Sequence, residues 1–438
     1  MGDALALPPL TLYIHIPWCV QKCPYCDFNS HALKQETQEE EYVTALLDDL
    51  DGELDAVAGR RLAAIFIGGG TPSLFSAAAI ERLLTGVARR IPFDADIEIT
   101  MEANPGTVEA GRFAAYQAAG VNRISIGIQS FNPQHLKALG RIHDPAQAIA
   151  AARQAASLSL RSFNLDLMHG LPGQSLEQAL DDLAQAIALA PPHLSWYQLT
   201  IEPNTAFGAR PPKLPEEEIL WEIQERGHQL LLAAGYHQYE ISAYAKPGYQ
   251  CQHNLNYWRF GDYIGIGCGA HGKLTDPASG AVLRRVKIKH PKGYLDPARP
   301  YLDEQWQVPA DELPFEYMMN RLRLFEAVPK AEFTARTGLD PAVMDTQLQS
   351  AMAKGLLLDE GSHWQITPLG HRYLNGLLEL FLDLATPTQT RMRHLAVDNL
   401  IARLSLPLLP VDGFKRPASG TLLHLGSYPQ RQQGLFYV

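Results

Sequence analysis

Three cysteines with close spacing are the residues of this chain whose types most clearly allow chemistry. They are Cys19, Cys23 and Cys26, in the pattern Cys-x3-Cys-x2-Cys, directly after a short apolar run. Three thiolates can bind three irons of a cubane cluster, whereas electron-transfer clusters ordinarily use four cysteines. The fourth iron would then be open to another ligand. The spacing therefore predicts an iron–sulfur site with chemistry at the open iron.

The same residue types allow two other kinds of site. Three thiolates together with the imidazole of His15 or His31 would make a Cys3His set of the kind that binds structural zinc. Cys23 and Cys26 alone form a Cys-x-x-Cys pair, which is typical of a redox-active dithiol. The spacing by itself leaves the iron–sulfur, zinc and dithiol hypotheses open.

A glycine-rich turn, Gly68-Gly69-Gly70-Thr71-Pro72, follows the next apolar run. Consecutive glycines let the backbone approach a ligand closely, with N–H groups that can hold an anion or an amino acid. The turn is not a P-loop, because no Gly-Lys-Ser/Thr follows it. Gly69, Gly70 and Thr71 are therefore candidate ligand-binding residues, although glycine turns after strands are common.

Four polar side chains, Glu102, Gln129, Arg141 and Asp166, lie in or just after later apolar runs. A carboxylate such as Glu102 can accept hydrogen bonds from hydroxyl or amino groups, and Arg141 could bind a carboxylate. Asp166 lies inside an apolar strand, where a charge is costly unless it is paired. A helix cap or an ion pair would also explain each residue alone. The hypothesis of a shared site depends on the position of all four at or near the carboxyl ends of predicted strands.

An alternation of short apolar runs and helical segments must position these residues. Nearly continuous apolar runs are typical of strands that are buried on both faces of a parallel sheet. The six predicted strands are Leu12–Ile16, Ala63–Ile67, Ile97–Met101, Ile124–Ile128, Phe163–Met168 and Leu194–Leu199. The predicted helices are Glu39–Val57, Ala77–Arg90, Val108–Ala119, Pro145–Ser157, Leu176–Ala190 and Glu216–Ala234.

The order of these segments predicts an α/β fold, an open parallel (β/α)6 partial TIM barrel. A barrel is favoured over a doubly wound sheet because polar and glycine-rich segments follow almost every strand, and barrel sites are built from such loops. We expect residues 1–300 to form this barrel, with a mixed β extension in its last part. Three short helices and a hairpin predict a smaller C-terminal winged-helix-like domain at 301–384. We expect residues 385–438 to form a poorly ordered tail.

Composition and charge limit the class of protein. The formal charge of −10 argues against nucleic-acid binding, so the winged-helix-like domain is expected to be a packing domain. No apolar run is long enough to predict a membrane span, and the N-terminus does not resemble a signal peptide. Five cysteines, three of them clustered, are typical of a reducing compartment and not of a disulfide framework. We therefore expect a cytoplasmic protein.

Taken together, these motifs resemble those of the radical S-adenosylmethionine (SAM) superfamily. Cys19, Cys23 and Cys26 match the ligands of the 4Fe–4S cluster in that family, and the glycine turn matches its glycine motif. The resemblance implies that the open iron binds S-adenosyl-L-methionine. It also implies an electron donor for the cluster, since one electron from the cluster cleaves the sulfonium to a 5′-deoxyadenosyl radical.

Within the superfamily, the resemblance narrows to the branch of oxygen-independent coproporphyrinogen III dehydrogenase (also called oxidase) and covers residues 8–382. The residues that fall where that enzyme contacts one of its two SAM molecules are Tyr13, Tyr25, Glu102, Gln129, Arg141, Asp166 and Thr200. The dehydrogenase carries a further cysteine two places after the third, where this chain has Phe28. It also has a longer N-terminal segment, whereas this chain begins eighteen residues before Cys19. Both departures favour the related haem chaperones of the HemW type.

A third motif agrees with the chaperone branch. The segment His253-Asn254-Leu255-Asn256-Tyr257-Trp258 matches an H-N-x-x-Y-W motif that is associated with haem binding in those chaperones. The resemblance implies that His253 is a haem ligand, and a neutral imidazole is a good axial ligand of haem iron. Taken without the family, packing of these side chains in the core is the more ordinary explanation.

The resemblance therefore implies a haem chaperone that binds a 4Fe–4S cluster, SAM and haem. It would deliver haem to an acceptor apoprotein such as a membrane respiratory enzyme. The alternative is coproporphyrinogen III dehydrogenase, which makes protoporphyrinogen IX by radical decarboxylation, and a third possibility is a radical enzyme with another substrate. The sequence leaves open whether the chain is an enzyme.

Overall fold

Parallel strands form the centre of a single large sheet. Among residues 7–33 and 38–382, which this computed structural model describes, the sheet has twelve strands in the order β14-β13-β12-β11-β1-β4-β5-β6-β7-β8-β10-β9. All neighbours from β11 through β1 to β8 are parallel. In this part of the chain β14 and β9 are the two edges of the sheet, so the barrel is open, as the sequence predicts.

All six predicted parallel strands are present, and a further parallel strand joins them. The predicted strands are β1 (Leu10–Ile16), β4 (Leu62–Gly69), β5 (Phe93–Ala103), β6 (Arg123–Gln129), β7 (Ser162–His169) and β8 (His193–Gln198). The further strand, β11 (Asp262–Ile266), pairs with β1 on the side opposite β4. The first strand of the chain is therefore enclosed by neighbours on both sides.

Antiparallel strands extend both ends of the parallel part. β10 (Ala243–Ala245) and β9 (His237–Glu240) follow β8. β12 (His271–Thr275), β13 (Val282–Lys287) and β14 (Leu302–Gln307) follow β11. The mixed β extension is expected to end at residue 300, whereas β14 continues these strands to Gln307, and the short helix α11 (Gln252–Trp258) lies among them.

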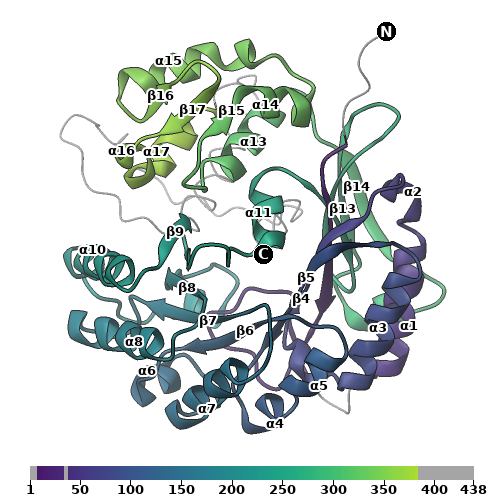
Figure 1. Cartoon of the computed structure of the whole chain (residues 1–438), viewed down its shortest axis with the longest axis vertical. Helices are drawn as coiled ribbons and strands as arrows, with labels where there is room; N and C mark the ends of the chain where they lie inside the picture. The colour runs from purple at the N-terminus through teal and green to yellow at the C-terminus, as the bar shows by residue number, and fades with distance from the viewer. Residues whose placement is uncertain (1–6, 34–37, 383–438) are drawn as a thin grey trace.

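Helices cover the outer side of the parallel strands and form an arc around them in Figure 1. The main ones are α1 (Glu39–Asp51), α3 (Ala77–Ala88), α5 (Phe113–Ala118), α6 (Pro133–Ala138), α7 (Pro145–Ala156), α8 (Leu176–Ala188) and α10 (Glu217–Ala233). Asp144 and Ser175 begin α7 and α8 with capping boxes, which satisfy N–H groups of the first turn.

Two predicted helices are interrupted. The segment predicted as Glu39–Val57 forms α1 and the separate α2 (Leu54–Val57), with Gly52 as the residue that ends α1. Glycine is a poor helix former and is common at helix ends, so the break has a local cause. The segment predicted as Val108–Ala119 likewise forms α4 (Thr107–Ala110) and α5.

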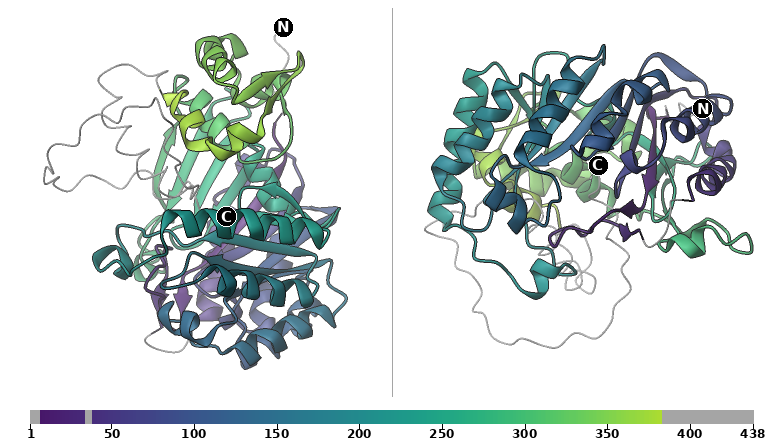
Figure 2. Two further views of the ribbon diagram at one scale, coloured as in Figure 1. Left: turned by 90° about the vertical axis from the view of Figure 1, so that its left-hand side faces the viewer. Right: turned by 90° about the horizontal axis from the view of Figure 1, so that it is seen from below.

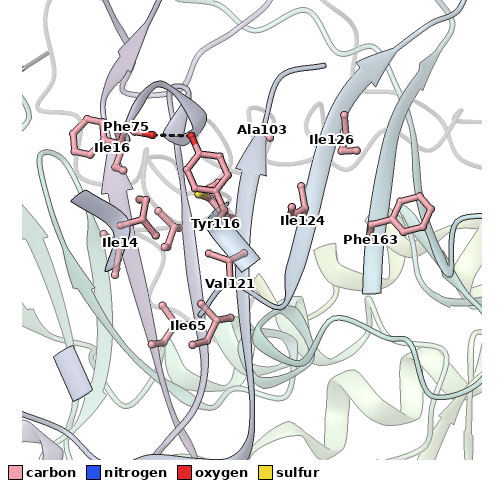
Figure 3. Close-up of a cluster of buried hydrophobic side chains, with 14 of the residues drawn as sticks. Ile14, Ile16, Ile65, Phe75, Ala103, Tyr116, Val121, Ile124, Ile126 and Phe163 are labelled. Carbon is pink, nitrogen blue, oxygen red and sulfur yellow. Dashed lines mark hydrogen bonds between the residues drawn. The ribbon is translucent and has the colours of Figure 1, made fainter. Parts of the chain in front are cut away.

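The main hydrophobic core lies between the strands and the outer helices. Ile14, Ile124 and Phe163 belong to it, and each is at most 6% exposed (Figure 3). The hydroxyl of Tyr116 on α5 donates a hydrogen bond of 2.7 Å to the carbonyl oxygen of Phe75 in the same region. The alternate side chains of the strands face the inside of the barrel, and several of them are polar. The strands are buried on both faces, as the sequence predicts, although several side chains on the inner face are polar.

A smaller winged-helix-like domain follows the barrel, as predicted. Its elements are α13 (Leu313–Arg321), β15 (Val328–Pro329), α14 (Lys330–Thr337), α15 (Asp345–Ala353), β16 (Leu357–Asp359), β17 (His363–Ile366), α16 (Pro368–Arg372) and α17 (Leu374–Glu379). Its core contains Tyr317, Phe333 and Trp364, and Phe260 from the barrel extension packs in the same cluster. Figure 1 shows the domain beside β9 and α11, and Figure 2 shows the molecule from two further sides. The predicted tail at 385–438 lies outside the described residues.

No helix within the described ranges combines the length and the apolar character that a membrane crossing requires.

Candidate functional site

A cavity of about 440 Å³ lies inside the open barrel. Its walls are the loops that follow the parallel strands and the inward side chains of β6, β7 and β8. The volume is in the range of pockets that bind small molecules. Most of the predicted site residues line this cavity: Cys19, Cys23, Cys26, Tyr25, Gly69, Gly70, Thr71, Glu102, Gln129, Arg141, Asp166 and Thr200. Residues that are far apart in the sequence are thus brought to one site.

The three cysteines lie on the loop that follows β1. Cys19 ends the two-residue strand β2 (Trp18–Cys19), which pairs with β3 (His31–Ala32) at the other end of the loop. Cys23 and Cys26 lie between these strands, where the Cys26 N–H donates to the Cys23 carbonyl oxygen at 3.1 Å. Burial raises the pKa of Cys26 to about 11 and also raises that of Cys19. A metal would therefore have to displace a proton from each of these two thiols.

The surroundings of His15 argue against a zinc site that uses this residue. The Nδ1 atom of His15 lies 2.9 Å from the Tyr13 hydroxyl, and its Nε2 atom lies 2.9 Å from the carbonyl oxygen of Asn29. Both ring nitrogens are therefore already hydrogen-bonded. Among the described residues, no three His, Cys, Asp or Glu side chains are close enough together to hold one metal ion. Three thiolates that each bind a different iron need not converge on one point, so the arrangement is compatible with a cubane cluster.

Arg141 connects the cysteine loop to the strands. Its Nη1 atom lies 3.7 Å from the Cys23 sulfur, while its Nη2 atom donates to Asn104 Oδ1 at 2.8 Å and to the Gly127 carbonyl oxygen at 2.6 Å. The two hydrogen bonds fix the guanidinium beside the loop. Its positive charge would balance part of the negative charge of three metal-bound thiolates.

The glycine turn lets the cysteine loop pack closely against the end of β4. A Cβ atom at Gly70 would lie 2.5 Å from the Trp18 carbonyl oxygen, and one at Gly69 would lie 2.7 Å from the His15 ring. Gly69 also has a φ of 118°, which L side chains rarely adopt. The Gly70 N–H donates to Ile16 and the Gly69 N–H donates to Glu102, so these two groups are not free to hold an anion. In this structure these two N–H groups therefore support the turn itself, and contact of Gly69 and Gly70 with a ligand stays a prediction.

Glu102 is an acid whose pKa is strongly shifted. Burial, followed by the nearby charge of Asp166, raises the pKa of Glu102 from 4.5 to about 8. Asp166 accepts hydrogen bonds from Ser125 Oγ at 2.9 Å and from Asn164 Nδ2 at 2.7 Å, and burial raises its pKa as well. Such shifted carboxyl groups in a cavity are typical of functional sites.

Gln129 ends β6 in an unusual backbone conformation. Its φ is 70°, in the left-handed region that few residues other than glycine adopt. Its Oε1 atom accepts a hydrogen bond of 3.0 Å from the Tyr197 hydroxyl on β8. Strained residues of this kind are frequent at ligand sites. The strain and the cavity position both favour a binding role for Gln129.

Two predicted residues, Tyr13 and His253, lie deeper than the rest. The ring of Tyr13 stacks on Phe66, which lines the cavity, at a centroid distance of 6.3 Å. His253 is fully buried, and its ring lies 5.4 Å from Phe66 and 6.4 Å from Tyr13. Burial lowers the pKa of His253 to about 3, so its imidazole is neutral. Of the His253–Trp258 motif, Asn254 and Trp258 line the cavity directly.

Sequence reasoning missed the polar side chains of β6 that face inward. Arg123 and Ser125 line the cavity, while Ile124 and Ile126 between them are buried in the outer core. The alternation of polar and apolar residues in the sequence was an available signal. Arg123 was a second signal, because a charge in an apolar strand is costly unless it is paired, as for Asp166.

Comparisons with known proteins agree with this geometry. The model of the radical SAM superfamily matches residues 13–186, and that of the HemN C-terminal domain matches residues 308–373. The chain is 65% identical over 376 residues to a protein of Escherichia coli K12 named "Heme chaperone HemW", covering 86% of this chain and 99% of that protein. It is 60% identical over 380 residues to the protein of the same name from Haemophilus influenzae, covering 86% and 98%.

A solved structure shares the fold. It is the coproporphyrinogen III oxidase HemN of Escherichia coli, described as a radical SAM enzyme. The TM-score is 0.72 at 23% sequence identity, and the match covers 86% of this chain and 90% of that chain. The likeness extends over both the barrel and the C-terminal domain.

Proposed function

This chain belongs to the HemW family within the radical SAM superfamily, and from that premise we propose that it is a haem chaperone. It would bind a 4Fe–4S cluster, SAM and haem, and it would deliver haem to an acceptor protein. We further propose a membrane respiratory enzyme as acceptor and an external electron donor for the cluster. Clustered free cysteines support a reducing compartment, the cytoplasm.

The observation that carries this proposal is that a single cavity joins the two motifs. The three cysteines line one part of it, and Trp258 of the His253–Trp258 motif lines another. If the iron–sulfur cluster had only a structural role, the cysteine loop and the His253–Trp258 motif would have no reason to line the same cavity. The shared cavity supports a function in which haem and the radical SAM site meet.

We assign the cofactors to the residues as follows. Cys19, Cys23 and Cys26 would hold the cluster, which supplies an open iron and an electron when it is bound. The residues that would contact SAM are Tyr13, Tyr25, Gly69, Gly70, Thr71, Glu102, Gln129, Arg141, Asp166 and Thr200. Their support is that all except Tyr13 line the same cavity as the cysteines.

His253 is the proposed axial ligand of haem. Neither of its ring nitrogens has a hydrogen-bond partner among the described residues, so its neutral imidazole keeps a free lone pair. Such an unsatisfied buried group is uncommon and calls for an explanation. Because the ring packs against Phe66 and is fully buried, Phe66 or α11 has to shift before His253 can reach haem.

The function can be tested on anaerobically reconstituted full-length protein. Haem binding is followed by the Soret absorption, haem transfer by loading of a haem-free acceptor, and radical chemistry by 5′-deoxyadenosine and protoporphyrinogen. We expect haem binding and transfer without protoporphyrinogen formation. Turnover of coproporphyrinogen would overturn the proposal in favour of the dehydrogenase, and so would a complete lack of haem binding.

Matched variants separate the two cofactors. Cys23→Ala is expected to lose the iron and the broad visible absorption of the cluster, whereas Cys251→Ala, a buried cysteine outside the loop, should keep both. His253→Ala is expected to weaken haem binding, with the exposed His237→Ala as its control. Unchanged haem affinity in His253→Ala would remove this residue as the ligand.

A further inference from the structure

A buried arginine without a partner faces the cavity. Arg123 is the first residue of β6, lines the cavity and is only 2% exposed. Its Nε–H has no hydrogen-bond partner, and no carboxylate among the described residues forms an ion pair with its guanidinium. Buried arginines are almost always paired, because an unpaired buried charge is costly. A group that is retained in this state points to an anionic ligand.

The carboxylates that interact electrostatically with this guanidinium are already bound elsewhere. They are Glu98 and Asp166. Glu98 Oε1 accepts a hydrogen bond of 2.7 Å from the N–H of Gln252. Both oxygens of Asp166 accept hydrogen bonds from Ser125 and Asn164. The two carboxylates lower the local positive potential, but they leave the hydrogen-bond donors of the guanidinium free for a ligand.

A second buried arginine lines the same cavity from the C-terminal domain. Arg323 follows α13, is 9% exposed, and stacks over the indole of Trp258 at 4.2 Å. It shares a long contact of 3.4 Å with Glu240, while its Nε–H has no partner. The indole N–H of Trp258, which is 5% exposed, has no partner either. Unpaired donors from two domains therefore line this cavity.

Arg123 lies at the opposite end of β6 from the cysteine loop. Arg123 begins β6 and Gln129 ends it near the cysteine loop, so six residue steps of about 3.3 Å separate the two ends by about 20 Å. The anion site is thus distinct from the end of the cavity at which Arg141 contacts Cys23. A ligand that reached Arg123 would have to extend into the barrel.

We propose that Arg123 and Arg323 bind the propionate carboxylates of haem. Guanidinium groups recognise carboxylates with paired, charge-assisted hydrogen bonds. Haem carries two propionates on one edge of a flat apolar ring, and two arginines and the indole of Trp258 line the same cavity. This inference rests on the proposed chaperone function and adds to it the orientation of haem, with its propionates at the inner end of the cavity.

The test compares haem with its dimethyl ester, in which both propionates are neutral, on the reconstituted full-length protein. We expect the native protein to bind haem about tenfold to a hundredfold more tightly than the ester, since charged hydrogen bonds have that value. Arg123→Gln should weaken haem binding by a similar factor and lose most of the preference over the ester. The exposed Arg89→Gln is the control and should keep both the affinity and the preference.

Two further measurements distinguish a ligand site from a structural role. Without haem, Arg123→Gln should still unfold in one cooperative transition, because it breaks no hydrogen bond or ion pair of the described residues and loses only the longer-range attraction of Glu98 and Asp166. Its affinity for SAM should also be unchanged. Equal binding of haem and ester by the native protein would overturn the inference without any variant, as would unaltered haem binding or weakened SAM binding in Arg123→Gln. If the native protein bound no haem, the proposed function itself would fall, and this inference with it.

Discussion

Replacement of Glu102 by glutamine should change how stability depends on pH. The pKa of Glu102 is raised from 4.5 to about 8, first by burial and then by the charge of Asp166. Glutamine has the shape of the protonated acid but cannot ionise. It can also accept the 3.1 Å hydrogen bond from the Gly69 N–H that Glu102 Oε2 accepts. The variant therefore removes the titration while it keeps the contact.

The sign follows from the two pKa values. Below pH 4.5 the acid is protonated in both the folded and the unfolded chain. As the pH rises to about 8, the unfolded chain releases the proton and the folded chain keeps it, so the free energy of unfolding falls. The loss is about 1.4 kcal/mol for each pH unit within this window. Between about pH 5 and about pH 9 it sums to about 4 kcal/mol, an upper limit because the cavity admits water.

Urea unfolding at about pH 5, about pH 7 and about pH 9 measures this effect. The native protein should lose up to about 4 kcal/mol more stability over that interval than Glu102→Gln. Glu81→Gln, which replaces an exposed carboxylate on α3, is the control and should follow the native protein. Parallel curves for the native protein and Glu102→Gln would refute the reasoning, since they would mean that Glu102 titrates alike in both states.

Three other substitutions test the frame around the site. Gly70→Ala would place a Cβ 2.5 Å from the Trp18 carbonyl oxygen, so it should cost about 1–3 kcal/mol and lower the iron content after reconstitution, measured by urea unfolding and iron analysis. Asp262→Asn would leave the buried Lys273, now 3.1 Å from the carboxylate, without its ion pair, and should cost about 3–5 kcal/mol in the same unfolding assay. Trp364→Ala would leave a cavity in the C-terminal core and should cost about 3–5 kcal/mol, with a lower melting temperature by calorimetry.

The outer side of the barrel could be predicted because local patterns determine it. Runs such as Ile124–Ile128 indicate strands wherever they occur, and the helix caps at Asp144 and Ser175 lie next to the helices that they begin. The three cysteines and the glycine turn could be recognised because each motif is defined by its spacing within a single loop, the first after β1 and the second after β4. These features are readable before any long-range contact is known.

The features that were missed depend on contacts between distant segments. β11 was not predicted as a parallel strand because its pairing with β1 joins opposite ends of the barrel sequence. The packing of His253 on α11 against Tyr13 of β1 and Phe66 of β4 could not be located from its motif, because it joins distant segments. Arg123 lies just outside the apolar run Ile124–Ile128 and is not among the predicted site residues. Only the inward direction of its side chain makes it part of the site.

The pairing of β1 with β11 has a consequence for the order in which the protein matures. Thr11 on β1 and Asp262 on β11 contact each other across 251 positions of sequence. A ribosome adds about 5–20 residues each second, so one side of β1 lacks its partner for about 10–50 s of synthesis. The cysteine loop follows β1 directly, and Asn29 within it is anchored to the Cys268 carbonyl oxygen just beyond β11. The cysteine loop therefore reaches its folded conformation only after most of the barrel has been synthesised. Insertion of the metal centre should accordingly follow synthesis of β11.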